Sequence, residues 1–98
     1  MSEIVVTNNP EQNRYEAHLD GELAGFAAYQ LTTGVITFTH TEVDPAFGGK
    51  GVGSALARGA LDDVDANSGR QVRPLCPFIK GWIDKHPQYA ALAVTEQG

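Results

Sequence analysis

The sequence predicts an α+β fold in which a mixed, mostly antiparallel sheet carries one β-α-β crossover and two helices. Three observations predict it. Four segments with the alternation or β-branched content of strands follow one another across short turns in the first half of the chain. A glycine-rich turn then leads into a helical pattern, and a short strand-like segment follows that helix. With 98 residues, the expected organisation is one domain, residues 1–98.

The first four expected strands are separated by polar or glycine-containing turns. Turn-forming residues fill positions 8–13, and Asp20-Gly21 is a hairpin signal of the primed type. Because short turns alone join these strands, they should form an antiparallel meander. The expected strands are residues 4–7, 14–19, 23–31 and 35–43.

The fourth expected strand ends in two ionisable residues. A period of two places its even-numbered residues, from Ile36 to Glu42, on one face of the sheet. His40 and Glu42 would then lie together, on the same face as Phe38 and next to the glycine-rich turn.

The turn that follows, Gly48-Gly49-Lys50-Gly51-Val52-Gly53, has the properties of an anion site. Glycines have no Cβ and let the backbone approach a ligand closely. The N–H groups of the next helix's first turn have no intrahelical partner, and the helix dipole and Lys50 favour negative charge. We therefore expect a phosphate or diphosphate here. A purely structural strand-to-helix turn is the alternative.

Two nucleotide-binding motifs are excluded by single residues. A Walker A loop needs a lysine where Ser54 stands. A dinucleotide fingerprint needs a third glycine where Leu56 stands, and it follows a parallel strand.

The expected helix starts near Val52, runs to about Asn67 and is capped by Gly69. A short strand at 71–76 should follow, parallel to the fourth strand through a right-handed crossover. A second helix starts at Pro77, stops before His86-Pro87 and is followed by one more turn; the tail from about residue 94 should be disordered. Phe78 and Trp82 should be core residues. The acids near the end of the first helix should face solvent; they are Asp62, Asp63 and Asp65.

The charge balance excludes some partners. The formal net charge is −5, from 12 acidic and 7 basic residues. Nucleic acids and anionic membranes need a basic surface, so neither is expected as a partner. A cationic amine remains compatible.

Cys76 is the single cysteine, so no internal disulfide can form and a reducing, cytoplasmic location is expected. No signal peptide or membrane-spanning run is expected.

Residues 43–56 resemble the acyl-CoA motif of the GNAT N-acetyltransferase superfamily. That motif reads Arg/Gln-x-x-Gly-x-Gly/Ala and follows a strand ending in Val-x-Pro. Gly51 and Gly53 match its two small positions, whereas Gly48 replaces the usual Arg or Gln. Lys50 and the backbone amides would have to compensate for that side chain.

The resemblance extends over about residues 14–92. His40-Thr41-Glu42-Val43, Cys76 and Lys85-His86-Pro87-Gln88-Tyr89 are similar to the small single-domain members of the YjdJ and NATD1 type. In that type the helices between the first two strands are absent. The resemblance implies a sheet that splays where its fourth and fifth strands part, with CoA in the cleft.

The resemblance also implies the site and the chemistry. The pantetheine would pair with the backbone near Glu42 and Val43, and the diphosphate would sit on the amides of the loop. An amine would attack the thioester directly; a base would take its proton and an acid would reprotonate the CoA thiolate. A backbone N–H of the fourth strand would polarise the carbonyl. The expected CoA-binding residues are Glu42, Val43, Gly48, Gly49, Lys50, Gly51, Val52, Gly53 and Ser54.

Four residues are candidates for catalysis, each with a structural alternative. His40 and Glu42 would be a base and its partner, or a satisfied polar pair at a strand end; histidine exchanges protons near neutral pH. Cys76 would be a cleft thiol near the acetyl group, or a small buried apolar residue. Tyr89 would be the acid, or an aromatic packed against the sheet.

The expected function is therefore an acetyl-CoA-dependent N-acetyltransferase that acts on an unidentified amine. No metal is expected, and the chain should be a monomer or a weak homodimer. Two alternatives remain: a non-catalytic CoA-binding or protein-interaction module with this fold, and a protein that binds another diphosphate compound.

Overall fold

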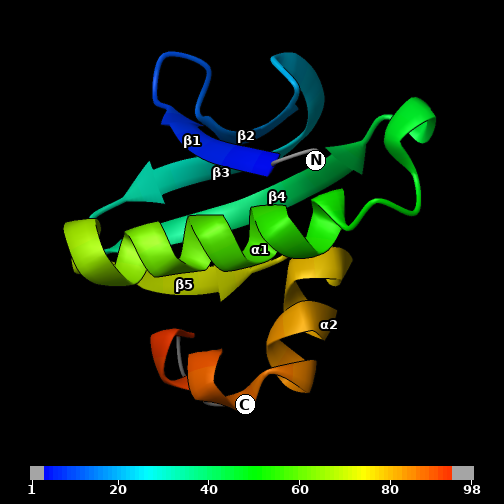
Figure 1. The fold of residues 1–98 in the computed structure, drawn as a ribbon. Helices are drawn as coiled ribbons and strands as arrows, with labels where there is room; N and C mark the ends of the chain where they lie inside the picture. Colours follow the sequence, from blue (N-terminus) through cyan, green and yellow to red (C-terminus); the bar gives the residue numbers. More distant parts are fainter. Residues whose placement is uncertain (1–3, 94–98) are drawn as a thin grey trace.

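A computed structural model describes residues 4–93 of the chain. Five strands form one sheet in the order β1-β2-β3-β4-β5 (Figure 1). In chain order the elements are β1 (Ile4–Asn9), β2 (Arg14–Leu19), β3 (Glu22–Thr32), β4 (Val35–Val43), the 3₁₀ turn η1 (Pro45–Phe47), α1 (Val52–Asp63), the π-helical turn η2 (Val64–Ser68), β5 (Gln71–Pro74), α2 (Pro77–Lys85) and the 3₁₀ helix η3 (Pro87–Leu92).

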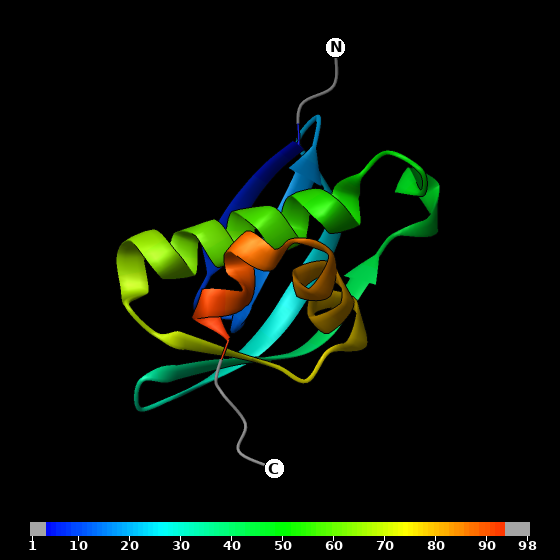
Figure 2. The same ribbon diagram turned by 90° about the horizontal axis from the view of Figure 1, so that it is seen from below.

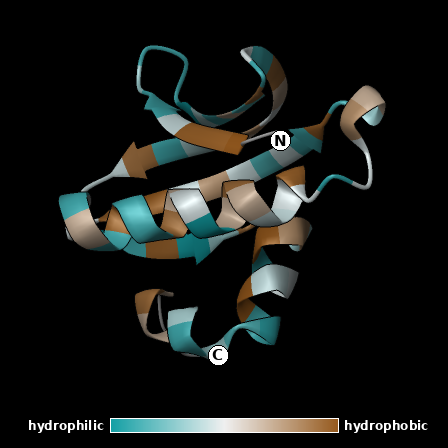
Figure 3. Ribbon diagram, viewed as in Figure 1, coloured by the Kyte–Doolittle hydropathy of each residue, from teal (hydrophilic) through white to brown (hydrophobic). Residues whose placement is uncertain are grey.

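The first four strands pair antiparallel, and β5 joins β4 in parallel after the α1 crossover. The predicted mixed, mostly antiparallel sheet with one β-α-β unit is confirmed. Asp20 and Gly21 both have positive φ, of 52° and 83°, as a primed hairpin turn requires. The hydrophilic turn between β1 and β2 contains no helix (Figure 3). The predicted disordered tail lies outside the described residues.

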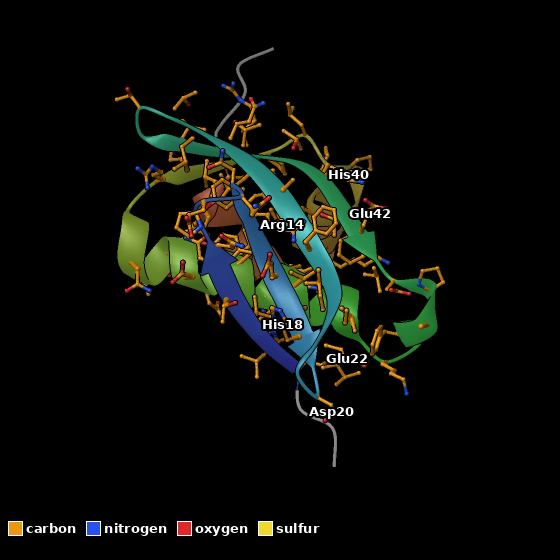
Figure 4. All side chains as sticks on the ribbon, turned by 90° about the horizontal axis from the view of Figure 1, so that it is seen from above. Arg14, His18, Asp20, Glu22, His40 and Glu42 are labelled. Carbon is orange, nitrogen blue, oxygen red and sulfur yellow. The ribbon has the colours of Figure 1, made fainter. Side chains whose placement is uncertain are left out.

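Both helices lie on one face of the sheet. They stand in front of the strands in one view (Figure 2), and the strands stand in front of them in the opposite view (Figure 4). We call the covered side the helix face and the other side the open face. In the described part of the chain no helix precedes β2, and neither α1 nor α2 lies on the open face (Figure 4).

The core lies between α1 and the helix face. Leu56 and Leu61 of α1 and Phe38 of β4 are completely buried there. Each such side chain contributes about 1.5–3 kcal/mol by leaving water. Gly59 allows α1 to approach β1 closely, since a Cβ at this position would lie 2.8 Å from the Cβ of Val6. The buried residues of α1 thus form the apolar side that packs on the sheet.

A β-bulge interrupts β4 at Thr39. Tyr29 of β3 pairs with Phe38, whereas its neighbour Ala28 pairs with His40, so Thr39 is the extra residue. The bulge reverses the alternation along the strand. Phe38 stays buried on the helix face, but His40 and Glu42 turn to the open face. The prediction that they share a face with Phe38 was therefore wrong, although the two do lie together.

The C-terminal end of α1 also differs from the prediction. The α-helix ends at Asp63, and a π-helical turn continues to Ser68 before Gly69 closes it with a φ of 66°. Asp63 is half-buried rather than solvated, because its carboxylate accepts a hydrogen bond from the Tyr15 hydroxyl at 2.6 Å.

Candidate active site

The paired strands β4 and β5 part beside the glycine-rich loop. Their register ends at Phe38 and Pro74, and Pro74 has no N–H to continue it. The Cys76 N–H makes the last link, donating to the Phe38 carbonyl at 2.9 Å. From Thr39 to Val43, β4 has no strand partner on this side among residues 4–93. The free edge leads directly toward the loop.

The loop itself has the geometry expected of an anion site. Gly49 and Gly51 both have a φ of 79°, in the left-handed region that favours glycine. A Cβ at either position would have no atom within 4 Å, so the loop is open to a ligand. Gly51 is the N-cap of α1 and offers no side chain to cap it, and no acid stands in the first helical turn. The positive end of the helix is therefore uncompensated, with exposed Lys50 next to it.

Contacts from β3 and η1 hold the entry to the loop in place. The Asp44 N–H donates to the Ala24 carbonyl at 2.8 Å, and the Asp44 carboxylate accepts from the Ala46 N–H at 2.9 Å. Gly25 passes so close to this point that a Cβ would lie 2.6 Å from the Glu42 carbonyl oxygen. This role of Gly25 was not predicted, because an isolated glycine in a strand has several explanations.

Two of the expected CoA-binding residues have side chains that are already engaged. Val52 is 2 % exposed and belongs to the core. The Ser54 hydroxyl accepts a hydrogen bond from the Trp82 indole at 3.1 Å, which ties α2 to the first turn of α1. These two residues can serve a ligand only through their backbone N–H groups. Phe78, predicted to be a core residue, is 43 % exposed and lies over Gly53 instead.

His40 and Glu42 form a pair on the open face. Nε2 of His40 lies 3.1 Å from Oε2 of Glu42, and both side chains are 60 % exposed. Both are seen near the end of β4 on the uncovered side (Figure 4). The pair is accessible to a substrate that approaches from this side, and Glu42 can orient the imidazole through that contact.

Cys76 lies on the opposite side of β4. Its thiol is buried and donates a hydrogen bond to the Thr41 hydroxyl at 3.1 Å. Thr41 stands between His40 and Glu42 in sequence, so it points to the helix face. The structure thus brings Cys76 to the same strand end as the His40–Glu42 pair, but to the other side of the strand. Thr41 was not singled out from the sequence.

Tyr89 lies in η3, away from the glycine-rich loop and the His40–Glu42 pair. Its hydroxyl donates to the Asp62 carboxylate at 2.7 Å, and its ring packs edge-on against Trp82 with centroids 4.9 Å apart. The hydrogen bond to Asp62 raises the pKa of Tyr89. Asp62 is eight residues beyond Ser54, about 12 Å along the helix axis. Tyr89 therefore packs as an aromatic residue, but against the helices rather than the sheet as predicted, and these contacts do not bring it to the loop.

Arg14, on the open face, is paired within the protein. Arg14 Nε contacts the Glu16 carboxylate at 2.8 Å, and the Arg14 guanidinium lies 4.7 Å from the centre of the Phe26 ring. The hydrogen bond from Arg14 holds the pKa of Glu16 below its ordinary value. Glu16 is therefore ionised at neutral pH and offsets Arg14.

Within the described residues, no three acidic, histidine or cysteine side chains converge as a metal site would require. No helix in this part of the chain is both long and apolar enough to cross a membrane.

Comparison with known proteins gives a consistent pattern. Residues 14–92 match the family model described as GCN5-related N-acetyl-transferase. No curated protein matches the chain.

Two solved structures resemble the fold. The ribosomal-protein-S18-alanine N-acetyltransferase from Escherichia coli has a TM-score of 0.58 and 18 % identity, over 76 % of this chain and 66 % of that one. The ribosomal-protein-alanine N-acetyltransferase from Brucella melitensis biovar Abortus 2308 has a TM-score of 0.54 and 23 % identity, over 87 % of this chain and 65 % of that one. The chain thus spans just under two thirds of the length of either enzyme.

Proposed function

Since this chain belongs to the family of GCN5-related N-acetyltransferases, we propose that it transfers an acetyl group from acetyl-CoA to the nitrogen of an amine. One observation carries the proposal. The open glycine loop, with its uncompensated helix N-terminus, lies at the end of a strand whose edge has lost its partner. An anion site that continues into a free strand edge suits a ligand with a diphosphate at one end and an amide-containing arm at the other.

The proposed contacts of CoA follow from this arrangement. The diphosphate would accept hydrogen bonds from the N–H groups of the loop and the first turn of α1, with Lys50 supplying positive charge. The pantetheine would follow the free edge of β4 toward Glu42 and Val43. Gly48 offers no side chain to the diphosphate, so the affinity should depend on the backbone and Lys50.

In the proposed reaction the amine nitrogen forms a bond to the acetyl carbonyl carbon while the carbon–sulfur bond breaks. We assign His40 as the base that takes the proton lost by the amine, with Glu42 as its orienting partner. The CoA thiolate must take up one proton to complete the reaction. We assign this step to the Cys76 thiol, because it lies beside β4 on the helix face, and solvent would then restore its proton.

Tyr89 is left out of this proposal, because its hydroxyl is bound to Asp62. The free thiol of Cys76 favours a reducing compartment such as the cytoplasm. Assignment to the small single-domain subtype stays a prediction.

Binding is tested by calorimetric titration with acetyl-CoA. We expect saturable binding by the wild-type protein and none at 1 mM ligand by Gly51→Val. Gly34→Val is the matched control, because Gly34 also has a positive φ, of 73°, and open space around it, but lies at the other end of β4. Gly34→Val should have similar backbone strain but keep the wild-type affinity for acetyl-CoA. Absence of wild-type binding, or equal loss in both variants, would count against the loop assignment.

Turnover is tested separately by following free CoA thiol in a panel of primary amines. Steady turnover that depends on the amine supports the enzyme. Binding of acetyl-CoA with no turnover in the whole panel supports the non-catalytic module instead.

A further inference from the structure

A cavity of about 290 Å³ opens next to the His40–Glu42 pair. It lies where the start of β3 runs beside the end of β4, on the side of β4 away from the free edge proposed for pantetheine. Its apolar wall includes Leu23, Phe26 and Pro45, and two carboxylate-bearing residues, Glu42 and Asp44, complete it. The cavity therefore lies across β4 from the free edge, and it shares Glu42 and Val43 with the proposed CoA site.

The lining of this cavity has a definite charge. It includes two acidic residues and no lysine, arginine or histidine. The guanidinium of Arg14 lies against Phe26 but is already paired with Glu16. A group that enters the cavity thus meets carboxylates, which attract cations.

The position of Glu42 links the cavity to the reaction. Its Oε2 atom is 3.1 Å from Nε2 of His40, and the same residue lines the cavity. An amine that gives its proton to His40 would therefore have the rest of its chain at the mouth of the cavity. The apolar wall would cover methylene groups, and the Asp44 carboxylate would hold a positive charge at the far end.

Resting on the proposed function, we propose that this cavity binds the second ammonium group of the acceptor, so that the acceptor is a flexible alkyl diamine. The size of the cavity agrees with this, because about 290 Å³ is at the small end of ligand sites. A chain of a few methylenes fits such a volume. Most of a peptide acceptor would instead lie outside the cavity, on the open face.

The kinetic test compares 1,4-diaminobutane with 1-aminobutane, which lacks the second charge. We expect the wild-type kcat/KM to be at least tenfold higher for the diamine. Asp44→Asn should lower the diamine value roughly three- to tenfold and leave the monoamine value unchanged. Asparagine keeps the oxygen that accepts from the Ala46 N–H, so the loop entry should survive. Glu22→Gln removes a charge nearby that does not line the cavity, and should change neither value.

Equal kcat/KM values for the two amines would overturn the proposal. So would an equal loss for both amines in Asp44→Asn, or a kcat/KM for an N-terminally blocked lysine peptide above that for the diamine.

A binding measurement separates this proposal from the proposed function. In protein saturated with CoA, titrated 1,4-diaminobutane should shift the NMR signals of Phe26 and Leu23, and Asp44→Asn should weaken the apparent affinity several-fold. If this binding is observed but no amine is acetylated, the proposed acetyltransferase activity is wrong and the proposed diamine site is supported. If the signals do not move, the cavity proposal fails whatever the activity.

Discussion

The Cys76 thiol donates a hydrogen bond to the Thr41 hydroxyl at 3.1 Å, on the side of β4 opposite to His40. The bulge at Thr39 creates this arrangement, because it turns His40 and Glu42 to the open face and Thr41 to the helix face. One strand end can therefore present a base to one side and a thiol to the other. In the proposed reaction the acceptor approaches from the open face, and CoA lies along the free edge of β4 beside the thiol.

Replacing Thr41 with valine tests the proposed role of the Cys76 thiol as a proton donor. Valine keeps the β-branched shape but removes the hydroxyl that positions the Cys76 thiol and can donate a hydrogen bond to the thiolate that forms. A neutral hydrogen bond contributes about 0.5–1.5 kcal/mol, which corresponds to roughly two- to tenfold in rate. We expect kcat to fall by that factor while the Kd for acetyl-CoA stays within about twofold. Thr32→Val, at an exposed position on β3, is the control and should change neither.

Replacing His40 with glutamine tests the base. Loss of a general base lowers kcat by about 10²- to 10⁴-fold. The Kd for acetyl-CoA should not change, because His40 faces the open side. His18 is a matched control: it is a histidine on the same face, 3.8 Å from Glu16. His18→Gln should retain full activity. Equal activities of the two variants would remove His40 from the mechanism.

The sequence was sufficient for the fold because its signals are local. Asp20-Gly21 and residues 10–13 mark tight turns, and Gly69 marks the end of the helical segment; Asn8 and Asn9, predicted in the first turn, belong to β1 instead. The strand boundaries followed from these turns. The loop was also predictable, since Gly49 and Gly51 are needed for positive φ and open space.

The parts that the sequence did not reveal depend on contacts between distant residues. Threonine stands at 37, 39 and 41, so the pattern looks the same with or without a bulge, and the face of His40 could not be read from it. Asp63 is one of three acids near the end of a helix, and only the packing of β2 shows that it receives the Tyr15 hydroxyl. Likewise, the place of Tyr89 depends on how η3 folds back on α1.

Two glycines in helices should respond to alanine with opposite signs. Alanine has the higher helix propensity, by about 0.8–1 kcal/mol. Gly81 of α2 has open space around it, so Gly81→Ala should raise the free energy of unfolding by up to that amount. At Gly59 the new Cβ would lie 2.8 Å from the Cβ of Val6, and overpacking of this kind costs about 1–3 kcal/mol.

Urea unfolding of both variants checks this pair of predictions. Gly59→Ala should have a lower midpoint than the wild type, and Gly81→Ala a higher one. A stabilised Gly59→Ala would mean that α1 does not pack on β1 as closely as the structure shows.

Loss of the Tyr15 proton should lower the stability of the folded protein in alkali. Burial, and then the hydrogen bond to Asp63, raise the pKa of Tyr15 above its ordinary value of 10.0. The folded state therefore holds this proton more tightly, and its stabilising contribution, complete below pH 10, is lost as the pH rises above 10. Tyr15→Phe should lower the free energy of unfolding by about 1 kcal/mol at pH 7. Between pH 10 and 11.5 its urea midpoint should decline less steeply than that of the wild type; Tyr29, whose pKa is also raised by burial, keeps part of the slope. Parallel declines would contradict the role of Tyr15.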